Sequence, residues 1–178
     1  PMTGWLARQF GRKRLLLGAI VGFTSASFLC GLAPNLASLI VFRVIQGAAG
    51  GAMQPLSQSI MLEAFPPQER GKAMAFWALC IVTAPILGPV IGGWLTDSYS
   101  WRWIFYINIP VGIISFVMAK LFVFDPPYLK GKPPSIDYWG IGMLVVGMAS
   151  LQIMLDKGQQ EDWFSSNFIV ILAIIAVT

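Results

Sequence analysis

Long apolar stretches alternate with short polar segments along the chain. Because an α-helix rises about 1.5 Å per residue, roughly 20 apolar residues cross the ~30 Å hydrocarbon core of a bilayer. The pattern predicts five such spans, at residues 15–33, 37–62, 73–95, 104–124 and 138–155. A sixth run begins near Asn167 and is still apolar where the sequence stops, so we expect a piece of a longer protein. The predicted fold is an all-α, polytopic transmembrane helix bundle.

The composition fits a membrane protein and excludes several other classes. Hydrophobic residues make up 56% of the 178 and charged residues 11%, against about 25% charged in a soluble domain. The sequence has no histidine, and Cys30 and Cys80 both lie within apolar runs, so neither a zinc site nor a disulfide framework is expected. The basic residues stand at the ends of apolar runs rather than in clusters, which does not indicate nucleic-acid binding.

The basic residues also predict how the spans are oriented, since they favour cytoplasmic loops. If the chain crosses at each span, nine of the twelve fall on one side, two fall on the other, and the twelfth, Arg43, lies within a span. The side with nine is therefore predicted to be cytoplasmic. It carries Arg8, Arg12, Lys13, Arg14, Arg70, Lys72, Lys120, Lys130 and Lys132, and the opposite side carries Arg102 and Lys157.

The connections between spans are short, so successive helices are expected to be antiparallel neighbours. The longest connection, residues 125–137, contains four prolines and two lysines, a composition typical of a cytoplasmic linker. It predicts a boundary between residues 1–124 and residues 138–178. Near an outer span boundary, four aromatic residues are typical of the belt found at membrane interfaces. They are Trp101, Trp103, Phe105 and Tyr106.

Arg43 is the one charged residue at depth in a predicted span, since Lys120 stands near the end of its own span, and charged residues at membrane depth mark functional sites by default. On a helical wheel at about 100° per residue, a polar or bare face lies within about 60° of Arg43. Its members are Gln46, Gly47, Gly50, Gln54, Ser57 and Gln58. One alternative is that the glycines serve helix packing and Arg43 snorkels to the outer interface. The length of the stripe favours a water-filled cavity that serves protons and substrate.

Arginine does not release its proton in proteins, so Arg43 is not itself a proton carrier. Every acidic residue of this sequence stands at a span end or in a loop. A proton-coupled protein would therefore need a membrane carboxylate from a helix outside this sequence. Arg43 would hold that carboxylate ionised until a proton or substrate displaces it.

The third predicted span ends in a run rich in glycine and proline. Small residues at spacing four let helix backbones approach closely, and the prolines are expected to bend the helix. The spacing predicts a pivot or a seal between bundles. The small residues are Ala84, Gly88 and Gly92, and the prolines are Pro85 and Pro89.

These motifs resemble the major facilitator superfamily, in particular the drug:proton antiporters of its fourteen-helix EmrB/QacA branch. Residues 39–47 match the fourth-helix pattern L-x-x-x-R-x-x-Q-G, whose arginine, here Arg43, the resemblance implicates in proton coupling. Gly88, Pro89, Gly92 and Gly93 match the antiporter pattern G-P-x-x-G-G of the fifth helix, with Ala84 where glycine is preferred. Residues 101–112, 155–158 and 162–164 also look like segments of this branch.

Residues 4–14 resemble the cytoplasmic loop motif between the second and third helices, through Gly4, Gly11, Arg12 and Lys13. The usual aspartate of that motif is replaced by Arg8, so its charge-relay contact is not carried over. The basic residues serve equally well as a cytoplasmic anchor.

The resemblance implies a major facilitator fold, present in part from the end of helix two to the start of helix eight. Residues 1–124 would belong to the amino-terminal six-helix bundle, 125–137 to a cytoplasmic linker, and 138–178 to an extra helix pair. The first helix of this branch, outside the sequence, carries a membrane acidic residue. The implied location is the bacterial inner membrane.

The function implied is multidrug efflux, which confers antibiotic resistance: export of hydrophobic or cationic drugs in exchange for protons, by alternating access. A proton gradient is the expected driving force, with no cofactor and no metal, and no phosphate-binding glycine loop is present. Alternatives are a proton-coupled exporter of a metabolite or siderophore, and a non-transporting scaffold or sensor. An enzyme is not expected, because no nucleophile has an activating partner. A periplasmic adaptor and outer-membrane channel are possible further partners.

Overall fold

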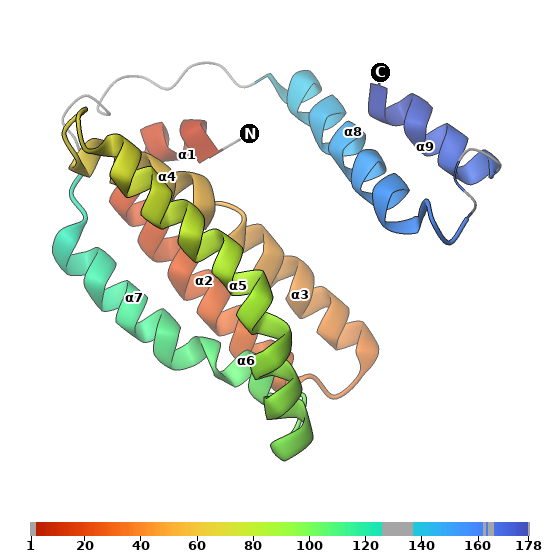
Figure 1. Cartoon of the computed structure of the whole chain (residues 1–178), viewed down its shortest axis with the longest axis horizontal. Coiled ribbons are helices and arrows are strands. Elements are labelled where there is room, and N and C mark those ends of the chain that lie inside the picture. Colours follow the sequence, from red (N-terminus) through yellow and green to blue (C-terminus); the bar gives the residue numbers. More distant parts are fainter. Residues whose placement is uncertain (1–2, 126–136, 162, 164–165, 178) are drawn as a thin grey trace. The chain divides into compact units, whose positions relative to one another are not determined.

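The computed structural model describes residues 3–125, 137–161, 163 and 166–177. All regular secondary structure in these residues is helical (Figure 1). The helices are α1 (Thr3–Phe10), α2 (Arg12–Leu32), α3 (Leu36–Gly50), α4 (Met53–Ala64), α5 (Arg70–Ser98), α6 (Trp103–Tyr106), α7 (Asn108–Phe122), α8 (Tyr138–Lys157) and α9 (Asn167–Val177). Lys130, Lys132 and the prolines of the predicted linker lie outside the described residues, as do Asp162 and Phe164.

Five helical segments are long and apolar enough to cross a membrane, which confirms the five predicted spans. They are Arg12–Leu32, Leu36–Ala64, Arg70–Ser98, Trp103–Phe122 and Tyr138–Lys157. The segment Asn167–Val177 is apolar but shorter. The chain is therefore a multi-pass helical protein whose composition suits a bilayer.

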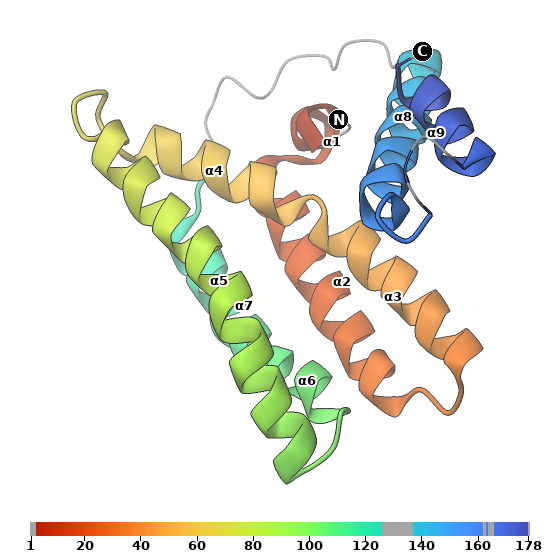
Figure 2. The ribbon, with the colours of Figure 1, turned by 45° about the vertical axis from the view of Figure 1, so that its right-hand side comes forward.

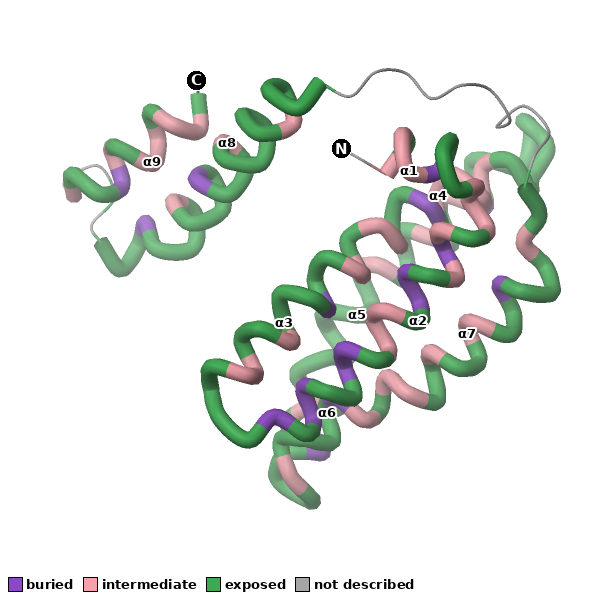
Figure 3. The backbone as a smooth tube through the Cα atoms, turned by 180° about the vertical axis from the view of Figure 1, so that it is seen from behind, coloured by how far each residue is buried: buried purple, intermediate pink, exposed green. Residues whose placement is uncertain are grey.

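The chain forms two compact units, one made of Leu6–Lys132 and the other containing Pro133–Thr178 and the first five residues. In the first unit α2 is the central helix and packs against both α3 and α7. Figure 3 shows that buried positions recur along α2. A core cluster at one end of this helix joins α1, α2, α4 and α7. Its buried members are Ala7, Leu16, Ile20, Leu56 and Ala119.

Two of the predicted spans are broken where the sequence pattern predicts continuous helices. The second span is interrupted at Gly51 and Ala52, so that α3 and α4 follow one another (Figure 2). Pro55 has no N–H to offer the carbonyl of Gly51, four residues earlier, which explains the interruption there. The fourth span is interrupted at Ile107, between α6 and α7, and Pro110 stands four residues after Tyr106 in the same way.

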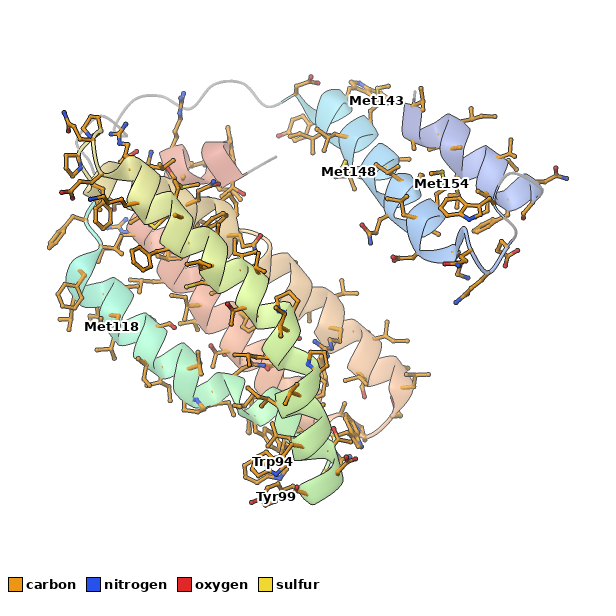
Figure 4. The ribbon with its side chains drawn as sticks, in the orientation of Figure 1. Trp94, Tyr99, Met118, Met143, Met148 and Met154 are labelled. Carbon is orange, nitrogen blue, oxygen red and sulfur yellow. The ribbon has the colours of Figure 1, made fainter. Side chains whose placement is uncertain are left out.

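Helix α5 runs from Arg70 to Ser98 without interruption, although Pro85 and Pro89 lie inside it. Its buried residues are Ala73, near its start, and Leu95, near its end. At that end the ring of Trp94 lies 5.8 Å from the ring of Tyr99 in an edge-on arrangement (Figure 4). The middle of α5, which carries the glycine and proline motif, is exposed.

In the second unit α8 and α9 pack against each other, as the short connection predicts. Asp137 caps the start of α8 by accepting a hydrogen bond from the N–H of Gly140 at 2.9 Å. After α8 the buried Gly158 lies against the ring of Trp163, and the N–H of Trp163 donates to the carbonyl of Gly158 at 2.8 Å. This contact forms the turn toward α9.

Candidate functional site

The guanidinium group of Arg43, on α3, has two partners in the structure. Its Nη1 donates a hydrogen bond to Oε1 of Gln46 at 3.0 Å. Its Cζ lies 4.5 Å from the centroid of the Phe105 ring, on α6, which is within the range of a cation–π interaction. Arg43 itself remains exposed, while Gln46 is only 3% exposed. The guanidinium group is thus held by two side chains, while Arg43 remains accessible.

A third helix reaches the same point through Cys30. Its thiol donates to Oε1 of Gln46 over 3.9 Å, and Cys30 is fully buried on α2. Gln46 therefore links α2 to the arginine of α3. The composition gave no functional signal for Cys30, because an isolated cysteine in an apolar run usually packs as a small hydrophobic residue.

The position of Phe105 differs from the sequence-based prediction. We expected it to lie in an aromatic belt at the interface, but it is only 5% exposed and faces Arg43, whereas Trp101 and Trp103 are exposed. A cluster of aromatic residues indicates depth in the membrane but does not say which ring turns inward. The direction follows from the break at Ile107, which the pattern does not reveal.

A hydrogen-bonded network supports this break from behind. The hydroxyl of Ser27, on α2, donates to the carbonyl of Phe105 at 3.0 Å. The amide nitrogen of Asn108 donates to Oγ of Ser27 at 2.9 Å and lies 3.4 Å from the carbonyl of Ile104. Ser27 is fully buried. Sequence reasoning missed both residues, although a lone asparagine two residues before a proline in an apolar run is a usable signal.

The rest of the predicted stripe extends past the break into α4. Gly50 lies against the ring of Phe23, where a Cβ atom would come within 3.0 Å of Cδ2, and Gly47 would meet nothing within 4 Å among the described residues. Beyond the break, the hydroxyl of Ser57 donates to the carbonyl of Met53 on its own helix at 2.7 Å. Gln54 is exposed and Gln58 is half-buried. The structure thus joins Arg43 and Gln46, and the role predicted for the other stripe residues stays a prediction.

The predicted loop motif lies where α1 meets α2. Arg12 forms an ion pair with Glu63 of α4, with 2.5 Å between Nη1 and Oε1. Gly11 has a φ of 86° and a Cβ there would lie 2.9 Å from Oδ2 of Asp125, while Gly4 would meet nothing within 4 Å among the described residues. Lys13 lies with its Nζ 5.3 Å from the centroid of the Phe124 ring.

The antiporter pattern lies on the exposed middle of α5. Ala84 and Pro89 are exposed, and a Cβ at Gly88 or Gly93 would meet nothing within 4 Å among the described residues. At Gly92 it would lie 4.0 Å from Cδ1 of Ile104. This face is therefore flat and is not covered by the described helices.

The chain has helices of membrane-spanning length, an arginine that fits the fourth-helix pattern, and a glycine-rich fifth-helix pattern. Together these features define one class of polytopic membrane protein. The sequence matches the Major Facilitator Superfamily over residues 1–178, and the chain belongs to that superfamily. This confirms the resemblance read from its motifs.

Among its relatives are several proteins named for export or resistance. The chain is 48% identical over 178 residues to the multidrug export protein EmrB of Haemophilus influenzae, covering 99% of this chain and 34% of the relative. It is 45% identical over 177 residues to the fatty acid resistance protein FarB of Neisseria gonorrhoeae, covering 99% and 35%. The same identity and length hold for EmrB of Escherichia coli K12, with 99% and 34% covered. The chain thus spans about a third of these relatives.

Proposed function

We propose that this chain is part of a secondary active transporter of the bacterial inner membrane. The transporter exports hydrophobic or cationic compounds in exchange for protons, by alternating access of two bundles around a midplane site. Several relatives named for multidrug export support this proposal. The observation that carries it is the guanidinium of Arg43, which lies within an apolar span with Gln46 and Phe105 as partners.

The direction of the Arg43 side chain weighs against simple snorkelling. A snorkelling arginine extends toward the nearer interface. The nearer end of the span Leu36–Ala64 is Leu36, whereas the hydrogen-bond partner, Gln46, lies almost one turn further from that end. The bond therefore draws the guanidinium toward the interior of the span, which favours a role there.

Arg43 would act as a fixed positive charge and not as a proton relay, because its guanidinium keeps its proton. A positive charge within about 4–6 Å of a carboxylate favours the ionised form. We place the partner carboxylate in the part of the protein beyond this chain. A proton or a cationic substrate would compete for that carboxylate, so binding of one would release the other.

The exposed face of α5 would be the contact surface with the rest of the transporter. Glycines without neighbours among the described residues leave room for a second helix backbone to approach closely. Gly88 and Gly93 would then lie at the interface between bundles and seal it against proton leak.

The test is uncoupler-sensitive efflux of a hydrophobic fluorescent cation, ethidium, by the complete protein in proteoliposomes with an imposed pH gradient. Arg43→Ala should reduce exchange at least about tenfold without loss of membrane insertion. Arg102→Ala is the matched control, because Arg102 also contacts an aromatic ring, Trp101 at 5.2 Å, and donates a hydrogen bond, to the carbonyl of Ala33 at 3.2 Å, but stands outside the membrane-length helices. Wild-type exchange by Arg43→Ala would refute the coupling role.

The same assay separates the alternatives. A scaffold or sensor would give no uncoupler-sensitive efflux from the wild-type protein. An exporter of a metabolite or siderophore would show ethidium transport that such a compound inhibits at lower concentration than other dyes do. FarB is named for fatty acid resistance, so a fatty acid belongs among the competitors. A periplasmic adaptor and outer-membrane channel would be detected by crosslinking in whole cells.

A further inference from the structure

The corner between α6 and α7 stands directly against Arg43, yet the proposed coupling step gives it no role. At this corner the ring of Phe105 contacts the cation, and Asn108 places a polar side chain inside an apolar span. The hydroxyl of Ser27, from α2, is completely buried there. Polar groups at membrane depth are costly unless they serve structure or function. This corner is therefore the part of the described structure that most needs an explanation.

We propose that Phe105 is a positioning residue for Arg43, and that Ser27 and Asn108 lock it in place. The inference rests on the proposed function, since it concerns how the coupling arginine is held. The Phe105 ring forms one wall of the guanidinium site, at 4.5 Å from Cζ, and Gln46 forms the other through its 3.0 Å hydrogen bond. We call these two walls the arginine seat.

The seat restricts a side chain that would otherwise have considerable freedom. An arginine side chain is flexible and has many accessible rotamers. A ring face on one side and an amide oxygen on the other select a single arrangement. A cation held in that arrangement acts on a carboxylate at a constant distance, and the strength of a charge interaction depends directly on that distance.

The backbone that carries Phe105 is fixed by side chains because the helix is interrupted there. Ile107 ends α6, and Pro110 brings no N–H to the carbonyl four residues before it. Membrane helices tolerate such breaks where side-chain hydroxyls and amides supply the missing donors. The Ser27 hydroxyl donates at 3.0 Å to the carbonyl of Phe105, next to the carbonyl that Pro110 leaves without a donor, and Asn108 orients that hydroxyl from 2.9 Å.

A second contact one turn along α2 completes the docking of the corner. Gly31 lies against the ring of Tyr106, and that ring stacks at 6.1 Å on Phe28. Ser27 and Gly31 are four residues apart, so both face the corner from the same side of α2. Phe105 is thereby held between two anchor points while its ring faces α3.

The test uses Phe105→Leu in the complete transporter, which removes the π face but keeps an apolar side chain. Ethidium–proton exchange in proteoliposomes should fall about twofold to fivefold in maximal rate, in the range expected for a cation–π contact of an exposed guanidinium. The KM for ethidium should change less than about twofold. The pH midpoint of exchange should rise, because a less well-placed cation lets the partner carboxylate take up its proton at higher pH.

Three further variants make the result specific. Phe105→Tyr keeps the ring and should restore the wild-type pH midpoint. Asn108→Ala should raise the midpoint in the same direction and, by loosening the ring, lower the rate about threefold, which tests the lock if Phe105→Leu fails to insert. Phe116→Leu is the matched control, because it removes a half-buried ring of α7, in the same span, that packs on the core cluster of Leu16 and Ala119 instead of on the corner. It should leave the midpoint unchanged.

The outcomes separate this inference from the proposed function. Wild-type exchange by Arg43→Ala overturns the coupling role and the seat together. Loss of exchange in Arg43→Ala with a wild-type rate and midpoint in Phe105→Leu overturns the seat alone. A lower rate in Phe105→Leu and Phe116→Leu alike, with no change of midpoint in either, shows that a ring of this span only supports the fold and also overturns the seat.

Discussion

The carboxylate of Asp125 accepts a hydrogen bond from the backbone N–H of Lys13, with 2.8 Å between Oδ1 and N, across 112 residues of sequence. The first N–H groups of a helix have no partner inside it, and a carboxylate there also meets the positive end of the helix dipole. Asp125 thus caps the start of α2, although it lies near the end of the first compact unit in the sequence. The start of α2 and the segment after α7 are joined by this contact.

Asp125→Ala should therefore destabilise the complete protein. The loss should be about 1 kcal/mol, the usual cost of removing an N-cap acceptor. Asp125→Asn keeps an oxygen acceptor and should lose less. Thermal unfolding in detergent, followed by tryptophan fluorescence, measures both. Equal melting temperatures for all three proteins would contradict the cap.

Gly11 should be intolerant of a side chain for two independent reasons. Its φ of 86° and ψ of 146° lie in a region that glycine alone usually adopts, where a side chain costs about 1–3 kcal/mol, and its Cβ would press on the Asp125 carboxylate. Gly11→Ala should lower the melting temperature of the complete protein. Gly4→Ala is the matched control from the same motif, since Gly4 lies in helix α1 with open space around it. A loss in Gly4→Ala as large as that in Gly11→Ala would argue against this explanation.

Gly31→Ala should disturb the corner that carries Phe105. The added methyl group would overlap the ring of Tyr106, which must move away from α2. We expect lower thermal stability together with reduced exchange, and Tyr106→Leu in the same protein should recover part of both. Gly18→Ala, on the same helix but with open space at its Cβ, should be neutral or slightly stabilising. Equal effects of Gly31→Ala and Gly18→Ala would show that the Tyr106 contact is not responsible.

Sequence alone predicts the spans well and the site only in part. Hydropathy predicts five spans because bilayer thickness requires a fixed length of apolar helix. The helical wheel places Gln46 on the face of Arg43, and the two side chains do bond. The breaks at Gly51 and Ile107 are harder to predict, because a membrane proline interrupts its helix only where neighbouring groups accept the break.

The contacts that sequence reasoning missed all join distant segments. Phe105 meets Arg43 from another helix, and Ser27 and Asn108 meet across 81 residues. Asp125 is the first residue of the predicted linker, yet it caps α2, near the amino terminus of the chain. Apolar and polar patterns describe one helix at a time, so they identify a face but not the residue that another helix brings to it.

The exposed glycine face of α5 leads to the last prediction. Gly88 has open space around it among the described residues. The lack of a side chain there is explained if another helix approaches closely. Gly88→Leu in the complete transporter should keep membrane insertion but reduce ethidium–proton exchange about tenfold, because forcing a large side chain into a close helix contact costs about 1–3 kcal/mol. Val90→Leu is the matched control, since Val90 is 67% exposed on the same helix and already carries a branched side chain. Proton leak through the empty transporter, measured with a pH-sensitive dye inside the vesicles, should rise in Gly88→Leu if the face seals the bundle interface. Full exchange with no leak in Gly88→Leu would mean that this face meets lipid instead.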